Sequence, residues 1–325
     1  MTNHETARLT RRMLLGSAPL LAQSASPAPE LVEARRIWGE APHSAFTDLV
    51  RFRDRWLCTF REGQGHAGGH GAIRVITSPD AKHWESAALL QETGADLRDP
   101  KLSVTPDGRL MAIMGGAVYE GGVYATRAPR VSFSPDGYSW STPRRLLAED
   151  HWLWRVTWHK GRAYSLSKLN EGPDAGRRGF LYGSGNGIDW QWITEFKAEG
   201  VSETTIRFLP NEEAIALVRP WWIGSSRPPY KQWTFHKMPV RMGGPNFLVM
   251  PDGRMWSITG NYLEGGRRTV LGELTSDSYR PVLTLPSGGD NSYAGMVWHD
   301  GLLWASYYSS HEEKTCIYLA VIRFR

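Results

Sequence analysis

The chain has 325 residues, of which 41% are hydrophobic and 22% charged, a composition typical of a folded globular protein and not of a disordered or fibrous one. Its formal net charge of +5 is small and scattered, which argues against a nucleic-acid partner and suits an anionic substrate. No proline- or serine-rich linker and no charge run divides the repeats described below, so we expect one domain over residues 31–325.

Residues 1–30 have the pattern of an export signal followed by a linker. Arg11 and Arg12 form a twin-arginine pair, and a modest apolar stretch follows as far as Ala22. This stretch is too short to cross a bilayer, so we expect no membrane span. The sequence therefore predicts a periplasmic or secreted protein, with a disordered tail as the alternative interpretation of these residues.

A hairpin pattern occurs six times along the chain. Each unit contains an apolar run, a polar turn and a second alternating run, which together indicate a β-hairpin. The turns recur roughly every 40 to 50 residues, which is the spacing of a structural repeat. The six units span residues 46–62, 102–116, 155–168, 204–219, 246–261 and 291–310.

One hairpin per repeat in an all-β chain predicts a six-bladed β-propeller, with one four-stranded blade for each repeat. We expect residues 31–38 to add a strand to the last blade, beside residues 315–323, because a closed ring leaves no exposed sheet edge. Cys58 and Cys316 fall on strands of the first and last repeats, and the sequence predicts two buried thiols and no disulfide.

A second repeated element lies between the hairpins. Segments 78–84 and 134–140 share the pattern S-P-D-x-x-x-W, and segment 184–190 is a degenerate third copy. In such a segment the Asp or Asn side chain accepts hydrogen bonds from nearby backbone N–H groups, a glycine allows positive φ, and the Trp packs underneath. We interpret these segments as tight turns between the outer strands of a blade, and therefore as scaffold.

Candidate functional residues lie at the ends of the innermost strands, because these strands open into the central funnel of a propeller. Cationic and anionic side chains recur there at equivalent positions, and their convergence would shift one another's pKa values, as functional sites do. Solvated strand ends are the alternative interpretation. The candidates are Asp48, Arg61, Arg98, Asp99, Arg155, Glu203, Arg219, Tyr293 and His311.

The repeated turns and hairpins resemble the Asp-box, or bacterial neuraminidase repeat, proteins, of which the six-bladed sialidases are the best known. The resemblance covers about residues 40–320. Segment 202–219 is similar to the sialidase segment in which a Glu polarises the nucleophile and an Arg binds the substrate carboxylate, which implies these roles for Glu203 and Arg219. Segment 292–295 resembles the one that carries the Tyr nucleophile, which implies that role for Tyr293.

Two further arginines take roles from the same resemblance. Arg61 matches the Arg that ends the first hairpin of the family. Arg268 is the expected second carboxylate-binding Arg, with Arg267 as its rival. Both would act on the anionic group of a sugar.

The sequence also departs from the family. Segment 46–49 stands where the first carboxylate-binding Arg is expected, and the Gly-rich loop 64–71 contains no acid where the acid/base Asp is expected. His66 and His70 in this loop are candidates for the proton transfer, because the ordinary pKa of histidine is near neutrality, although both also suit an exposed loop. Further candidates for the missing acid are Asp48 and Asp99.

The sequence predicts an exo-acting glycoside hydrolase for an acidic or modified sugar, with Tyr293 as nucleophile and Glu203 as its base. One alternative is a polysaccharide lyase for uronic-acid glycans, in which His66 or His70 and Tyr293 act as acid and base. The other is a non-catalytic carbohydrate-binding propeller. We expect a monomer with a glycan ligand and no cofactor, and the dispersed histidines form no metal-ligand pattern.

Overall fold

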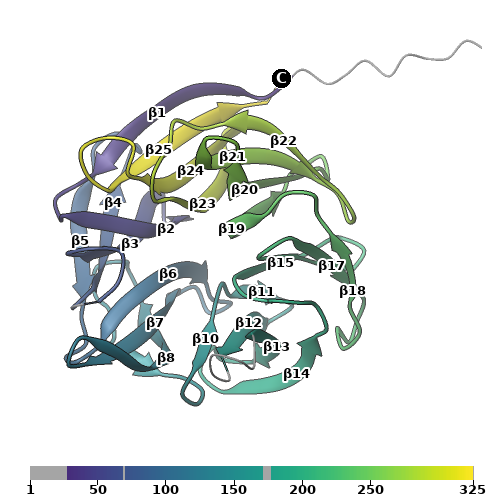
Figure 1. Cartoon of the computed structure of the whole chain (residues 1–325), viewed down its shortest axis with the longest axis horizontal. Helices are drawn as coiled ribbons and strands as arrows, with labels where there is room; N and C mark the ends of the chain where they lie inside the picture. Colours follow the sequence, from purple (N-terminus) through teal and green to yellow (C-terminus); the bar gives the residue numbers. More distant parts are fainter. Residues whose placement is uncertain (1–27, 69, 171–176, 325) are drawn as a thin grey trace, which may run out of the picture.

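Six antiparallel sheets surround a central axis in the computed structural model, which describes residues 28–68, 70–170 and 177–324 (Figure 1). Five sheets have four strands and one has five, and none of the described residues lies in a helix. The fold is an all-β six-bladed β-propeller, as the spacing of the hairpins predicted. Most of the expected export leader, residues 1–27, lies outside the described residues.

The first three blades follow one another along the chain. The first contains β2 (His43–Phe52), β3 (Arg55–Gly63), β4 (Ala72–Ser78) and β5 (Glu85–Leu90). The second contains β6 (Asp96–Val104), β7 (Leu110–Glu120), β8 (Val123–Ser134) and β9 (Arg144–Arg145). The third contains β10 (His151–Leu153), β11 (Thr157–His159), β12 (Arg162–Asn170), β13 (Arg177–Ser184) and β14 (Trp190–Phe196).

The remaining three blades complete the ring. The fourth contains β15 (Thr204–Phe208), β16 (Ala214–Val218), β17 (Trp222–Ser226) and β18 (Thr234–Lys237). The fifth contains β19 (Met242–Val249), β20 (Met255–Leu263), β21 (Gly266–Leu274) and β22 (Tyr279–Thr284). The sixth contains β23 (Asn291–His299), β24 (Leu302–Ser309), β25 (Cys316–Arg323) and the N-terminal strand β1 (Glu30–Trp38).

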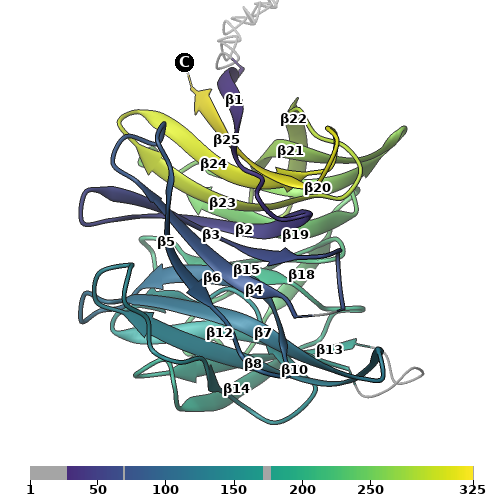
Figure 2. The same ribbon diagram turned by 90° about the vertical axis from the view of Figure 1, so that its left-hand side faces the viewer.

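The ring closes between the two ends of the chain. Strand β1 pairs antiparallel with β25, with Ala34 opposite Ala320 and Arg35 opposite Leu319 (Figure 2). The outer edge of the last blade is thus supplied by the start of the propeller, which ties the first and last segments together. This is the closure that the sequence predicted.

The six predicted hairpins are the pairs of inner strands in the six blades. In three of them both turn residues have positive φ, as in Arg53 (47°) and Asp54 (61°) or Asp300 (50°) and Gly301 (73°). Such turns match the right-handed twist of the strands that they join. The cysteines of the first and last hairpin regions, Cys58 and Cys316, are buried and unpaired, as predicted.

The S-P-D-x-x-x-W segments form the turns between outer strands. Asp136 Oδ1 accepts hydrogen bonds from the backbone N–H groups of Tyr138 and Ser139, both at 2.8 Å. The indole of Trp140 donates to the carbonyl oxygen of Gly137 at 2.9 Å. The side chain therefore satisfies the backbone of the turn, and the Trp closes it. The same bonds occur in segments 78–84 and 184–190.

Apolar side chains between neighbouring blades form the core, and Trp56, Trp152, Trp154 and Trp256 are buried there. The innermost strands of the blades face the central axis (Figure 1). Within the described residues, no helix is long and apolar enough to cross a membrane.

Candidate active site

A β-bulge recurs at the same place in the innermost strand of four blades. The pairing register shifts by one residue between Ala45 and Asp48 in β2, and at the matching points of β6, β19 and β23. The first residue of each bulge has a left-handed backbone, with φ between 51° and 65°. Bulges of this kind re-aim side chains and occur beside active sites. The four residues are Phe46, Asp99, Gly244 and Tyr293.

Tyr293, Glu203 and Arg219 form one hydrogen-bonded cluster, although they come from two blades. The Tyr293 hydroxyl donates to Glu203 Oε1 at 2.6 Å. Arg219 Nη1 donates to the same oxygen at 2.6 Å and to the Tyr293 hydroxyl at 3.3 Å. The backbone N–H of Gly244 donates to Glu203 Oε2 at 2.8 Å. Both oxygens of Glu203 are thus fixed, and one of them faces the phenol.

The charges of this cluster set opposite protonation states for the acid and the phenol. Burial favours protonated Glu203, but the charges of Arg219 and Lys168 and the bonds from Tyr293 and Gly244 outweigh it and lower the pKa of Glu203 to about 2. Burial and the negative charge of Glu203 raise the pKa of Tyr293 well above its ordinary value. Near neutral pH the site therefore holds a carboxylate beside a neutral phenol.

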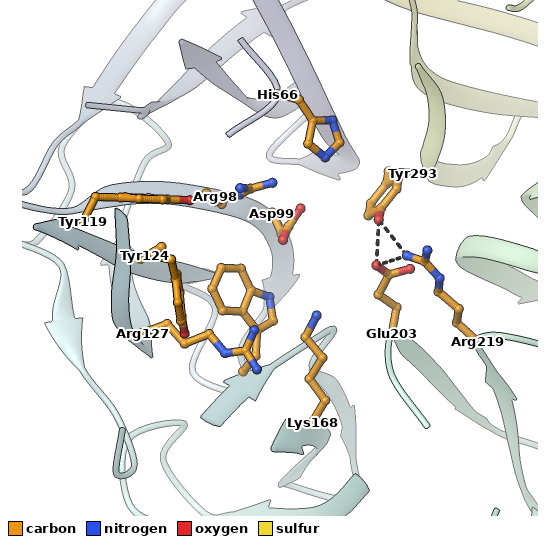
Figure 3. A pocket seen from close by; sticks show the side chains of 12 residues that line it. His66, Arg98, Asp99, Tyr119, Tyr124, Arg127, Lys168, Glu203, Arg219 and Tyr293 are labelled. Carbon is orange, nitrogen blue, oxygen red and sulfur yellow. Dashed lines mark hydrogen bonds and ion pairs between the residues drawn. The ribbon is translucent and has the colours of Figure 1, made fainter. Parts of the chain in front are cut away.

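The cluster opens into a cavity of about 280 Å³ at one mouth of the propeller (Figure 3). This volume is close to the lower end of the range of about 300–1,000 Å³ for small-molecule sites, so it suits one or two sugar units. The described residues that line it are His66, Arg98, Asp99, Ala117, Tyr119, Tyr124, Arg127, Trp152, Lys168, Glu203, Arg219 and Tyr293.

His66 enters the cavity from the loop after β3 and is oriented by a carboxylate. Its Nδ1 lies 2.5 Å from Asp290 Oδ2, so Asp290 engages Nδ1 and not Nε2. Asp290 also accepts a hydrogen bond from the Tyr308 hydroxyl at 2.8 Å and lies 3.4 Å from His43 Nε2. Burial favours protonated Asp290, but the hydrogen bonds from His43 and His66 hold its pKa below the ordinary value. A carboxylate on one nitrogen fixes the tautomer of the ring and leaves the other nitrogen for proton transfer.

The wall away from Tyr293 is cationic and aromatic. Lys168 and Arg127 both lie over the ring of Trp152, with Nζ and Cζ each 5.5 Å from its centroid. Tyr119 and Tyr124, from the long hairpin of β7 and β8, complete this wall, as Figure 3 shows. Burial lowers the pKa of Lys168 to about 8, a shift that the nearby charge of Glu203 opposes and that of Arg127 increases.

Several predicted residues lie in the cavity, and others do not. Glu203, Tyr293, Arg219 and His66 line it, together with Arg98 and Asp99. His70 and His311 are exposed and are not among the described residues that line it. His311 Nδ1 instead lies 2.8 Å from Ser309 Oγ.

Asp48 and Arg155 bond to each other in the buried interior of the propeller. Arg155 Nη1 lies 2.7 Å from both Asp48 oxygens, and both side chains are buried. Asp48 Oδ2 also accepts a hydrogen bond from the backbone N–H of Leu102. Nearby, Lys101 Nζ donates to the Thr47 carbonyl oxygen at 3.1 Å. Arg155 lines a separate cavity. The pair therefore joins the blades through buried polar bonds, and neither member lines the cavity that contains Tyr293.

Arg61 holds the Gly-rich loop in place. Its Nε donates to Asp96 Oδ1 at 2.7 Å, and its Nη1 and Nη2 donate to the carbonyl oxygens of Gly65 (2.7 Å) and Gly68 (3.3 Å). A Cβ at Gly71 would lie 2.0 Å from Asp96 Oδ1, so this close approach needs glycine. Arg61 is fully buried and positions the loop that carries His66.

The structure places Arg267, and not Arg268, beside Tyr293. The Cζ of Arg267 lies 5.6 Å from the centroid of the Tyr293 ring. Arg268 Nη1 donates to the Arg267 carbonyl oxygen, and Arg268 is not among the described residues of the cavity. The rival of the sequence-based choice is thus the one near the candidate nucleophile.

Sequence reasoning missed most of the cationic and aromatic wall. The predicted second hairpin ended at residue 116, whereas β7 and β8 continue to a turn at Gly121 and Gly122, which have φ of 56° and 81°. The pair of glycines between alternating Tyr and Val residues was the available signal for this extension. Asp290 was not predicted as the partner of His66.

His43, His66 and Asp290 each offer a ligand atom within 4.8 Å of the other two. Two ligands of a tetrahedral metal at about 2.0–2.2 Å stand roughly 3.3 Å or more apart. The His66–Asp290 distance of 2.5 Å is instead that of a hydrogen bond, and Arg267 Nη1 lies 3.9 Å from Asp290 Oδ1. We therefore assign the group as a hydrogen-bonded network.

Comparisons with known proteins bear on the fold. No protein-family model matches the sequence, and no curated protein matches it. Solved structures do: a protein of unknown function from Dyadobacter fermentans has a TM-score of 0.81 at 18% identity, over 92% of this chain and 100% of its own. Trypanosoma rangeli sialidase in complex with the inhibitor DANA has a TM-score of 0.71 at 13% identity, over 91% of this chain and 60% of its own. The fold is that of the sialidase-like β-propellers.

A second kind of glycosidase shares the fold. The α-L-arabinofuranosidase of Fusarium graminearum, solved as a mutant in complex with an iminosugar inhibitor, has a TM-score of 0.69 at 14% identity. The match covers 87% of this chain and 93% of that chain. Glycosidases with different sugars thus occur on this sialidase-like scaffold, and the choice among activities depends on the side chains of the cavity.

Proposed function

We propose that the protein is an exo-acting glycoside hydrolase in which Tyr293 is the nucleophile, Glu203 its base and His66 the acid that protonates the leaving group. The observation that carries this proposal is the 2.6 Å contact between the Tyr293 hydroxyl and Glu203 at the end of a small cavity. A phenol is a weak nucleophile at neutral pH, so it needs a carboxylate in contact with its proton. A cavity of about 280 Å³ suits the end of a glycan, which favours exo cleavage.

The reaction runs in two balanced steps. In the first, Tyr293 Oη bonds to the anomeric carbon, its proton passes to Glu203, and the glycosidic bond breaks as His66 protonates the leaving oxygen. In the second, His66 takes a proton from a water molecule that attacks the same carbon, and Tyr293 leaves with the proton held by Glu203. The anomeric carbon gains positive charge as the glycosidic bond breaks. Its attraction for the Tyr293 oxygen offsets the raised pKa of the phenol.

The other residues hold the substrate. Asp99, at the bulge of β6, is suited to accept hydrogen bonds from sugar hydroxyls, and Arg98 stands next to it. Tyr119 and Tyr124 offer ring faces against which a sugar can pack. A neutral phenol as nucleophile avoids repulsion of an anionic sugar, so the substrate of this site is an acidic or otherwise modified sugar.

A polysaccharide lyase, with His66 and Tyr293 as acid and base, is the second candidate enzyme. A lyase tyrosine has to remove a proton from carbon, and this requires an accessible phenolate. Burial and Glu203 raise the pKa of Tyr293, which disfavours that state. The contact between Tyr293 and Glu203 therefore favours a hydrolase over a lyase.

Product analysis on a glycan panel tests the proposal. Hydrolysis releases saturated reducing sugars, a lyase leaves an unsaturated end that absorbs in the ultraviolet, and a binding protein leaves the glycan intact. We expect saturated monosaccharide from the native protein and none from Tyr293→Phe. An unsaturated product, or an unchanged glycan across the panel, would overturn the hydrolase.

We also propose that the protein acts outside the cytoplasm. The Arg11-Arg12 pair and the apolar stretch that follows support export of the folded chain by a twin-arginine route. Replacement of both arginines by lysine is expected to leave the protein in the cytoplasm, which fractionation and immunoblotting measure. Unchanged export of that variant would contradict this route.

A further inference from the structure

The cations that line the cavity fall into two groups, those that are ion-paired with a carboxylate and those that are not. Arg219 is ion-paired with Glu203 at 2.6 Å, so its charge is already neutralised. Lys168 and Arg127 on the far wall make no ion pair with a carboxylate among the described residues, and Arg127 Nη2 is buried without a hydrogen-bond partner. Buried donors without partners are costly, so such a nitrogen indicates a place where a ligand completes the bonding.

Arg98 adds a third donor, which contacts both Tyr119 of this wall and the Phe46 ring beside Tyr293. Its Nε is buried without a partner, and its Cζ lies 5.2 Å from the centroid of the Phe46 ring. The carboxylates of the described cavity lining are Asp99 and Glu203, against the four cations Arg98, Arg127, Lys168 and Arg219, while Asp96 and Asp150 act on Arg98 and Arg127 from outside the lining. The lining itself therefore carries more positive than negative charge.

The surroundings of Tyr293 offer less to an anion. Phe46, fully buried at the bulge of β2, packs its ring 5.3 Å from that of Tyr293 at the point where the sialidase resemblance led us to expect an arginine. Lys101 Nζ and Arg267 Cζ lie 5.8 Å and 5.6 Å from the centroid of the Tyr293 ring, and Nε and Nη2 of Arg267 are buried without hydrogen-bond partners. Neither residue is among the described residues that line the cavity. A ligand in the cavity thus meets the ion-paired Arg219 on the nucleophile side and, opposite, Lys168 and Arg127 without an ion-paired carboxylate.

We propose that the anionic group of the substrate sugar binds to Lys168 and Arg127, on the wall away from Tyr293, with Arg98 as a further donor. This inference rests on the proposed function and names its substrate class: a sugar that bears a carboxylate or a sulfate ester on the side of the ring away from the anomeric carbon. Arg127 supplies a planar fork and Lys168 a point charge, and both oxyanions accept such bonds. The Trp152 ring beneath them keeps water from one side of the contact.

Binding to the Tyr293→Phe variant tests the inference without turnover. The probes are methyl glucuronide for the carboxylate, methyl glucoside 6-sulfate for the sulfate, and methyl glucoside as the neutral match, measured by calorimetry. We expect at least one anionic probe to bind more tightly than the neutral one. Adding Lys168→Met or Arg127→Met should weaken that binding by about 10- to 100-fold and leave the neutral probe unchanged.

Two further variants make the outcome decisive. Lys82→Met removes an exposed lysine of an outer turn and is the matched control, which we expect to bind like its parent. Arg267→Met tests the rival position beside Tyr293. Weaker binding in Arg267→Met with no change in Lys168→Met and Arg127→Met would overturn the inference, and so would no preference for either anionic probe. Circular dichroism confirms the fold of each variant.

The two proposals fail in different ways. Anionic binding that depends on Lys168, with no hydrolysis of any glycan, would leave this inference intact and remove the hydrolase. Hydrolysis that depends on Tyr293, together with anion binding that is unchanged in Lys168→Met and Arg127→Met, would support the hydrolase and remove this inference.

Discussion

The hydroxyl of Tyr293 lies 2.6 Å from Glu203 Oε1, although the two residues are 90 positions apart in the chain. Glu203 directly precedes β15 and Tyr293 lies near the start of β23, so both stand at the same mouth of the funnel. The contact therefore follows from the repeat: equivalent ends of innermost strands converge on one axis.

Tyr293→Phe is expected to abolish turnover and to preserve the fold. Phenylalanine keeps the ring contacts with Phe46 and Trp154 and removes only the hydroxyl. Glu203→Gln should lower kcat less completely, because the amide can still accept the bond from Tyr293 but is a poor base. Steady-state kinetics on a cleaved substrate measures both. Substantial activity in Tyr293→Phe would exclude the tyrosine nucleophile.

The fold was predictable because its signal is periodic, while parts of the site were not because they depend on bulges. Successive side chains of a strand point to opposite faces of the sheet. A bulge of one residue therefore exchanges the two faces for every residue after it. This shift places Phe46 and Asp99 at the bulges and leaves Asp48 two residues farther along β2, buried and bonded to Arg155. Neither the hairpin spacing nor the residue types reveal such a shift.

The choice between Arg267 and Arg268 was open for a similar reason. Adjacent residues of β21 point to opposite faces, and sequence alone does not say which face meets the neighbouring blade. Tyr262 lies opposite Arg267 in the register with β20, and the Arg267 Cζ is 5.6 Å from both the Tyr262 and the Tyr293 rings. The site-facing side is thus fixed by the packing of blade five against blade six.

Asp48→Asn is expected to destabilise the protein. The substitution removes the partner of Arg155 and leaves a buried guanidinium without its counter-charge, which typically costs about 3–5 kcal/mol. The midpoint of denaturant unfolding should fall accordingly. Asp54→Asn is the matched control, because Asp54 is exposed and asparagine tolerates its positive φ of 61°. Equal stability of the two variants would contradict a structural role for Asp48.

His66→Asn should slow cleavage of glycosides with poor leaving groups much more than those with activated ones. An acid is needed only where the leaving oxygen has to be protonated, and such catalysis is worth about 10²- to 10⁴-fold. A natural disaccharide and the matching nitrophenyl glycoside provide the comparison. His236→Asn, on the exposed outer strand β18, is the control and should behave as the native protein. Equal losses on both substrates would rule out His66 as the acid.

Asp290→Asn is expected to slow the same reaction through its effect on His66. The Asp290 carboxylate accepts a hydrogen bond from Nδ1 of His66 and so fixes the orientation of the ring. Its loss should lower kcat for the natural disaccharide more than for the nitrophenyl glycoside, as the loss of His66 does. Equal losses on both substrates would mean that Asp290 only supports the loop.

The affinity for an anionic substrate should fall as pH rises through about 8. The pKa of Lys168 is lowered to about 8 by burial, so its ammonium is present below this pH and is lost above it, unlike that of an ordinary lysine. The contribution of Lys168 to anion binding is therefore full below pH 8 and disappears above it, and KM should rise there for an anionic but not for a neutral substrate. The charges near Lys168 are those of Glu203, Arg127, Asp99 and Arg177.

Lys168→Arg separates this effect from other titrations. Buried Lys101, whose pKa burial also lowers to about 8, lies beneath Tyr293 and would produce a limb in the same range. Arginine keeps its charge at alkaline pH, so the variant should bind the anionic substrate with a KM that no longer rises above pH 8. If the rise persists in Lys168→Arg, the proton is lost from another group, of which Lys101 is the nearest candidate, and Lys168 does not hold the substrate anion.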